Sequence, residues 1–278
     1  MTSTETARQT LEEFLSFPLH TADDIFARFE SIPGAIAGRG DNALERYVCI
    51  PGNRKNKLVL VAHTDTVWDD AYGKPAQTTV CFENGYYRST NPDCGIGADD
   101  RAGCAMLWVL RDCGHTILLV NGEEKGKHGA RFLRKSNPTL FRFLNRHQFM
   151  MELDWRGTGQ CLYNQVDYTT CFHKYITKTL GFQDNEHPGG CDLQILCHRI
   201  CGVNIGVGYH NWHNPKEFLC LSEWENTLSC LTGFLQLQHP RFKVSIYKKV
   251  YRFLARVKNK LFRIAKSMFA RKAEENKD

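Results

Sequence analysis

The sequence lacks the features of a secreted or membrane-spanning protein. Residues Met1 to Glu13 are mostly polar, and they contain neither the basic segment nor the apolar segment of a secretion signal. No apolar run approaches the roughly 18 residues that a transmembrane helix requires. We therefore expect a cytoplasmic protein.

The sequence also lacks the paired cysteine spacing of a structural zinc site. Its twelve cysteines are spread from Cys49 to Cys230, many of them inside apolar runs. Cys191, Cys197 and Cys201 form the closest cluster, but it contains one C-x₃-C step and no second pair to complete a zinc site. We favour buried, reduced thiols over a disulfide framework or a zinc role for this cluster.

Charge is distributed unevenly along the 278 residues. Residues 241–278 contain 13 Lys/Arg and 3 Asp/Glu, a balance of +10, whereas residues 1–240 contain 23 and 27, a balance of −4. We expect one domain over 1–240 and a basic amphipathic helix over 241–278. One stripe of that helix would hold Val250, Leu254, Val257, Leu261, Ile264 and Met268. Two roles for the helix stay open, namely packing on the body or on a second copy, and binding an anionic membrane or nucleic acid.

Apolar strands alternate with helices along the body, which is typical of an α/β fold with a mixed, mostly parallel central sheet covered by helices on both faces. We predict a hairpin over 79–89, around Asn84-Gly85. The other predicted strands are 46–50, 57–62, 116–120, 148–153 and 203–207. The predicted helices are 5–16, 21–31, 100–111, 127–135, 168–180, 192–199 and 223–236.

Acidic or imidazole side chains stand where these strands end or where a helix begins, which is where ligands bind in open α/β sheets. Taken singly, each has a plain structural explanation, such as a helix cap or a solvated acidic loop. Five such endings in succession are better explained by one divalent metal site with oxygen and nitrogen ligands. The segments are His63-Thr64-Asp65, Gly97-Ala98-Asp99-Asp100, Glu123-Glu124, Glu152-Leu153-Asp154 and His210-Asn211-Trp212-His213.

The order H-x-D, G-A-D-D-x-A-G, E-E, strand-end Asp and H-x-P-x-E resembles the co-catalytic di-zinc exopeptidases. That clan includes zinc aminopeptidases, tripeptidases and the glutamate carboxypeptidase group. The pattern spans roughly residues 57–230, and Gly189-Gly190-Cys191-Asp192 is similar to a further loop of the family. Only 58 residues separate Asp154 from His213, so we expect a single catalytic domain without a lid insertion.

The resemblance implies a role for each matching residue. His63, Asp99 and Asp154 would hold one Zn²⁺, and Asp99, Glu124 and His213 a second, with Asp99 bridging; Co²⁺ or Mn²⁺ are alternatives. Glu123 would be the general base, Asp65 would orient His63, and Asp100 would follow a strained peptide bond. His210 competes with His213, which we prefer because it occupies the family's His-Thr-Pro-x-Glu frame, with Asn214 in place of Thr.

The resemblance implies a metal-dependent exopeptidase, with an aminopeptidase favoured, acting on short peptides through metal-activated water. Glu152 or Asp192 would suit a substrate α-amine, and Arg156 a carboxylate. An N-acyl amino acid deacylase on the same site is one alternative. A non-catalytic metal-binding or interaction protein that acts through its basic tail is another.

Overall fold

Two β-sheets organise the residues that the computed structural model describes, which are 4–73, 77–163, 165–185, 187 and 189–244. The larger sheet has the strand order β1-β2-β6-β3-β7-β10-β8-β9, and the smaller has the order β11-β12-β5-β4. The strands are β1 (Ile36–Arg39), β2 (Arg46–Ile50), β3 (Val59–His63), β4 (Val80–Glu83), β5 (Tyr86–Ser89), β6 (Thr116–Val120), β7 (Met150–Trp155), β8 (Gln160–Leu162), β9 (Gln183–Asn185), β10 (Gly202–Gly206), β11 (Tyr209–His210) and β12 (Phe218–Cys220). The helices are α1 (Thr4–Ser16), α2 (Asp23–Glu30), α3 (Ala98–Leu110), α4 (His128–Ser136), α5 (Pro138–Leu144), α6 (Thr170–Leu180), α7 (Leu193–Leu196) and α8 (Leu221–Phe234), with short 3₁₀ helices η1 (Asp70–Tyr72) and η2 (Arg111–Cys113).

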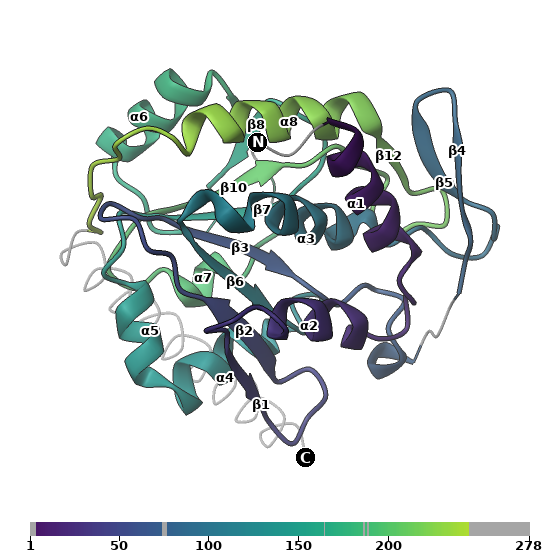
Figure 1. Ribbon diagram of the computed structural model, residues 1–278, viewed down its shortest axis with the longest axis horizontal. Helices are drawn as coiled ribbons and strands as arrows, with labels where there is room; N and C mark the ends of the chain where they lie inside the picture. Colours follow the sequence, from purple (N-terminus) through teal and green to yellow (C-terminus); the bar gives the residue numbers. More distant parts are fainter. Residues whose placement is uncertain (1–3, 74–76, 164, 186, 188, 245–278) are drawn as a thin grey trace, which may run out of the picture. The chain divides into compact units, whose positions relative to one another are not determined.

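Four parallel strands, β6-β3-β7-β10, form the centre of the larger sheet. Every residue of these strands is buried, because helices cover the sheet on both faces. Helix α3 packs on β3 and β7, and α1 and α8 lie beside it, as Figure 1 shows. On the other face, residues of α4, α5 and α7 join strand side chains such as Val59, Val61 and Leu118 in one apolar cluster. The predicted α/β fold class is confirmed.

Most predicted elements lie within a few residues of their expected bounds. The strands predicted over 46–50 and 116–120 coincide with β2 and β6. Asn84 and Gly85 join β4 to β5 with positive φ angles of 51° and 87°, as a two-residue hairpin turn requires. The predicted hairpin is therefore confirmed.

Other elements were wrong or missed. The helix predicted over 192–199 is the single turn α7, because Cys197 takes an extended conformation and Asn145 Oδ1 then accepts the N–H groups of His198 and Arg199. Helix α5 was not predicted, although its signal is in the sequence: Pro138 begins it, and Asn137 Oδ1 caps the Leu140 N–H. The short strands β1, β8, β9, β11 and β12 were also missed.

All twelve cysteines lie in the described part of the chain, none of them is paired in a disulfide there, and eight are buried. Cys191 and Cys197 belong to the apolar cluster on the α4 face, and none of the candidate metal-ligand groups among the described residues contains a cysteine. The prediction of buried thiols is confirmed. No helix of the described part is long and apolar enough to cross a membrane.

The compact unit that carries the site ends at Lys243. Nearly all of the predicted tail helix, 241–278, lies outside the described residues. Its amphipathic stripe and its two possible roles therefore stay predictions.

Candidate active site

The acidic and imidazole residues singled out in the sequence meet at the carboxyl edge of the parallel strands. His63 is the last residue of β3, Glu123 and Glu124 follow β6, and Asp154 is the next-to-last residue of β7. Because these strands are neighbours and parallel, their carboxyl ends open on the same edge of the sheet. Residues more than 90 positions apart in the chain are thereby brought together.

Asp99 enters this edge from the amino end of α3. Glu217 fixes it there, since its two carboxylate oxygens accept the N–H groups of Gly97 (2.8 Å) and Asp99 (3.1 Å). The peptide bond between Asp99 and Asp100 is cis. The Asp100 carboxylate is completely buried and accepts the backbone N–H of His63 at 3.2 Å. Asp99 faces the site, and Asp100 holds the backbone beneath it.

The two oxygens of Asp99 face two different imidazoles. Oδ1 lies 3.0 Å from Nε2 of His63, and Oδ2 lies 3.2 Å from Nε2 of His213. His63 Nε2 is also 3.4 Å from Oδ1 of Asp154, while His213 Nε2 is 2.8 Å from Oε2 of Glu124. One carboxylate thus stands between two groups of ligand-type atoms.

His213 reaches the site from the loop between β11 and β12. That loop is held in place because β12 pairs with β5, the second strand of the predicted hairpin. His210, the competing candidate, points elsewhere: its Nε2 is 2.7 Å from Glu223 Oε2, and its ring stacks on Phe218 at 4.9 Å. The geometry therefore favours His213 as the imidazole that faces the carboxylates.

Asp65 supports the acidic loop as well as His63. Its carboxylate accepts the backbone N–H groups of Gly122 (2.7 Å), Glu123 (3.1 Å) and Glu124 (3.2 Å). His63 Nδ1 lies 3.4 Å from Oδ1 of the same carboxylate. Sequence reasoning foresaw the contact with His63 but not the three N–H groups, since it does not show which loops meet.

Glu123 and Glu124 are adjacent, yet they point to different partners. Glu124 faces His213, whereas Oε1 of Glu123 pairs with the ammonium of Lys127 at 2.8 Å. Lys127 has a side chain only 15% exposed and a positive φ of 60° at the start of α4. This lysine was not predicted as a site residue, because Glu123 lies in the turn before α4 and a lysine at a helix start is common in proteins without a site.

Asp154 is held by two residues that sequence reasoning also missed. Tyr209 donates its hydroxyl to Asp154 Oδ1 at 3.1 Å, and Asn204 Oδ1 accepts the Asp154 N–H at 3.0 Å. Asn204 belongs to β10, the neighbour of β7 in the larger sheet, and Tyr209 begins β11 of the smaller sheet. The carboxylate is therefore fixed in orientation before any ligand binds.

The electrostatics of this cluster show an excess of buried negative charge. Burial, and then the nearby charge of Asp99, raise the pKa of Glu124 to about 8. Burial also raises the pKa of Asp154 well above its usual value, and Asp99 adds to the effect. Burial alone would lower the pKa of His213, but the carboxylates of Asp99 and Glu124 raise it to about 10. In addition, Oε1 of Glu124 is buried without a hydrogen-bond partner in the described structure.

A divalent metal fits this donor set. Ligand atoms of His63, Asp99 and Glu124 lie within 4.8 Å of one another, and so do those of His63, Asp100 and Asp154. Asp100 is already committed to backbone N–H groups, so Asp99 is the better ligand beside Asp154. Carboxylates and imidazoles without thiolates suit Zn²⁺ and similar ions, and their positive charge would offset the acidic excess.

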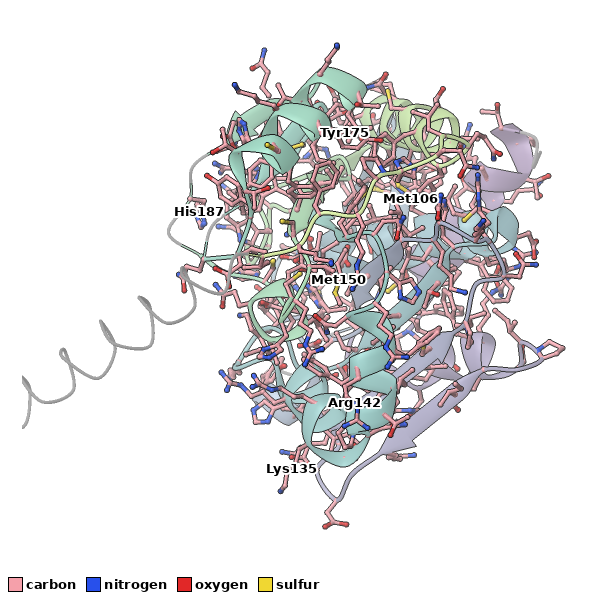
Figure 2. The ribbon with its side chains drawn as sticks, turned by 90° about the vertical axis from the view of Figure 1, so that its left-hand side faces the viewer. Met106, Lys135, Arg142, Met150, Tyr175 and His187 are labelled. Atoms are coloured by element: carbon pink, nitrogen blue, oxygen red, sulfur yellow. The ribbon has the colours of Figure 1, made fainter. Side chains whose placement is uncertain are left out.

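The cluster lines a cleft of about 220 Å³. Among the other lining residues, the rings of Trp155 and Trp212 lie 5.9 Å apart, and His187 lies within 5.8 Å of both. Figure 2 shows His187 near the left edge of the molecule. The lining of the cleft therefore combines carboxylates with an aromatic group. The lining residues are His63, Asp99, Glu123, Glu124, Asp154, Trp155, Leu162, His187, Gly189, Gly190, Cys191, Asn204, Tyr209, Trp212 and His213.

The sequence profile of Peptidase family M28 matches residues 47–187, which is half of the chain and includes the first four acidic segments. The chain belongs to peptidase family M28. This membership confirms the prediction of a metallopeptidase, a hydrolase of peptide bonds, and a divalent metal is consistent with it. No curated protein sequence matches the chain significantly.

Solved structures of other peptidases share the fold of this M28 protein. The aminopeptidase PepT of Bacillus cereus ATCC 10987 has a TM-score of 0.64 at 14% identity, over 84% of this chain and 98% of that one. A tripeptidase of Staphylococcus aureus has a TM-score of 0.61 at 15% identity, over 85% and 98%. The TET aminopeptidase of a marine sediment thaumarchaeon has a TM-score of 0.57 at 10% identity, over 85% and 98%. At these identities the similarity concerns the fold.

The structure also tests which groups of this M28 peptidase could bind a substrate terminus. Glu152 and Asp192 are completely buried and do not line the cleft, so neither is placed to meet an α-amine. Arg156 stacks over Trp155 and Trp212, at 5.3 and 4.8 Å from the ring centroids, and does not line the cleft either. All three suggestions from the sequence are therefore unsupported.

Proposed function

We propose that this protein is an aminopeptidase that holds two divalent metal ions, with Zn²⁺ preferred and Co²⁺ or Mn²⁺ as alternatives. The observation that carries the proposal is the position of Asp99 between His63 and His213, one carboxylate oxygen facing each imidazole. Asp154 adds an oxygen on the His63 side, and Glu124 adds one on the His213 side. These five residues are the proposed ligands.

Glu123 is the proposed general base. It lines the cleft, and Lys127 holds one of its two oxygens, which fixes the direction of the carboxylate. Bound divalent ions would polarise the scissile carbonyl and lower the pKa of the attacking water. Glu123 would accept a proton from that water and return it to the leaving amine. Asp65 would hold the loop of Glu123 and Glu124 in position, because it accepts three backbone hydrogen bonds from that loop.

The cleft favours an exopeptidase that recognises an amine. Its volume of about 220 Å³ is small for an extended peptide that continues in both directions. The four carboxylates among the described residues that line it are already assigned to the metal ions and to the general base. No lysine or arginine lines the described cleft, so no side-chain cation is placed there to hold a free carboxylate, and this favours an amino terminus as the recognised end.

The test is mass spectrometry of peptides incubated with the zinc-loaded protein. One substrate would be a free hexapeptide, the second the same peptide with an acetylated amino terminus, and the third the same peptide with an amidated carboxyl terminus. We expect stepwise loss of residues from the amino end of the first and third peptides and no cleavage of the second. Removal of the metal with a chelator should abolish cleavage, and re-addition of Zn²⁺ should restore it.

Glu123→Ala is the control, because it removes the proposed base and leaves the proposed ligands intact. Cleavage that persists in this variant would remove Glu123 from the mechanism. Release of acetate from acetyl-amino acids, with no cleavage of the free peptide, would replace the proposal with a deacylase. Loss of residues from the carboxyl end would reverse the predicted direction.

A further inference from the structure

A second cavity lies outside the cleft, on the surface formed by α4, α5 and the loop between α7 and β10. It has a volume of about 260 Å³ and shares no lining residue with the cleft. Figure 2 shows Arg142 of α5 on this face. The lining residues are Arg134, Pro138, Phe141, Arg142, Asn145, Arg146, His198 and Arg199.

The four arginines of this cavity have no acidic partner. None of them takes part in an ion pair within the described residues. Arg142 donates to the hydroxyl of Thr139 at 3.1 Å, and the Arg134 guanidinium lies 5.7 Å from the ring centre of Phe141. Their side chains are exposed, so their charges face the solvent of the cavity.

The surrounding sequence is strongly segregated in charge. Residues 125–151 contain no Asp or Glu, although residues 1–240 as a whole contain more acidic than basic residues, 27 against 23. Seven of those 23 basic residues occur in this stretch of 27 residues. Lys125 and Lys127 precede α4, and Lys127 is paired with Glu123, which leaves five on or just after α4 and α5: Arg131, Arg134, Lys135, Arg142 and Arg146. Such a concentration of one sign creates a local positive potential that an anion would reduce.

The cavity is rigidly built. Asn145 is 2% exposed, and its Oδ1 accepts the N–H groups of His198 and Arg199, both at 2.8 Å. Its Nδ2 donates to the carbonyls of Phe141 (3.1 Å) and Leu196 (3.0 Å). One buried amide thus links the loop that carries Arg199 to the end of α5, and the nearly buried ring of Phe141 also lines the cavity.

We propose that this cavity binds a small molecule bearing a phosphate or diphosphate group. Guanidinium groups match the oxygens of phosphate with paired hydrogen bonds. A carboxylate carries one negative charge and would leave most of the four arginines unpaired, whereas a phosphate ester carries up to two and a diphosphate more. A cavity of this size encloses one or two phosphate groups. The proposal does not depend on the peptidase reaction.

The experiment is calorimetric titration of the full-length, metal-loaded protein with inorganic phosphate and with pyrophosphate, at constant ionic strength. The variant is Arg142→Gln with Arg199→Gln, which removes one charge on α5 and one on the loop between α7 and β10. The control is Lys135→Gln with Arg131→Gln, since both residues are exposed on α4, remove the same charge and do not line the cavity. Thermal unfolding of all three proteins verifies that they are folded.

We expect pyrophosphate to bind the wild type, and the Arg142/Arg199 variant to bind it at least ~10-fold more weakly, because two charge-assisted contacts are lost. The control should bind like the wild type. Equal binding by all three proteins would overturn the proposal, because the anion would then sit in the cleft or on the general positive surface. No binding to the wild type, or binding of single-stranded RNA but not of either phosphate, would overturn it as well.

Discussion

Replacement of Asp65 by asparagine is the most informative single change in the site, because it removes a charge while it preserves the shape of the side chain. Oδ1 of Asp65 accepts two backbone N–H groups, from Gly122 and Glu123, and Oδ2 accepts the N–H of Glu124 and the hydroxyl of Tyr72. In Asp65→Asn, one of these oxygens becomes an NH₂ group that cannot accept.

The size of the effect follows from these contacts. With the amide oxygen at the Oδ1 position, the Glu124 N–H would lose its acceptor, which costs about 1–3 kcal/mol in a buried loop. The two remaining N–H bonds would pass from a charged to a neutral acceptor and lose about 1 kcal/mol each. We expect Asp65→Asn to lower the free energy of unfolding by about 4 kcal/mol, a large share of the roughly 5–15 kcal/mol typical of a protein.

The assay is urea unfolding of the metal-free protein, so that altered metal binding does not contribute. Asp69→Asn is the matched control, because Asp69 is also buried in this segment but accepts a single backbone N–H, that of Ala71 at 2.9 Å. Asparagine is itself a good helix cap, so the control should lose less than ~1 kcal/mol. If the two variants unfold within about 1 kcal/mol of each other, the assigned role of Asp65 is refuted.

Three further predictions follow from other contacts. Lys127→Met should lower kcat about 10–100-fold with little change in KM, because Glu123 loses the partner that directs it; unchanged peptide kinetics would contradict this. Gly103→Ala should lower the free energy of unfolding by ~3 kcal/mol or more in urea, because a Cβ there would lie 2.0 Å from a carbonyl of β7. Gly233→Ala, in α8 with open space around it, should instead raise the free energy of unfolding by up to ~1 kcal/mol. Burial lowers the pKa of His115 to about 4, below its unfolded value of about 6.5. The contribution of the buried neutral imidazole to stability is therefore complete above pH 6.5 and is lost as the pH falls toward 4. The stability difference between wild type and His115→Asn should therefore shrink by ~3 kcal/mol between pH 7 and 4, and a constant difference would show that His115 is not buried as a neutral ring.

The catalytic candidates were accessible to sequence reasoning because their signals are local. His63 and Asp154 lie at the end of a short apolar strand, and Glu123 follows one. The end of such a strand can be recognised in the sequence, because the run of apolar residues stops there. The order of the motifs then indicated the family. By contrast, Tyr209 and Lys127 carry no such signal, since a tyrosine or a lysine near a strand or helix end occurs in many proteins without a site.

The choice between His210 and His213 also could not be settled from local sequence. His210 ends β11, and His213 lies three residues later in the loop to β12. The pairing of β12 with β5 holds that loop, so that His213 faces Glu124 while His210 lies beside Glu223. Likewise, the helix predicted beyond Leu196 was wrong because Asn145, some 50 residues away, takes the N–H groups that helix would have used. Both outcomes depend on contacts between distant segments.

The sequence by itself therefore determined the α/β class, the central strands and the residue types of the proposed metal site, because apolar periodicity and strand-end chemistry are properties of short stretches of chain. The tertiary structure alone decided the orientation of each carboxylate, the burial of Glu152 and Asp192, the pairing of Lys127 with Glu123 and the gathering of four arginines around one cavity. These features depend on which loops pack together, and packing is set by the whole hydrophobic core and by buried hydrogen bonds such as those of Glu217, Asn145 and Asp65.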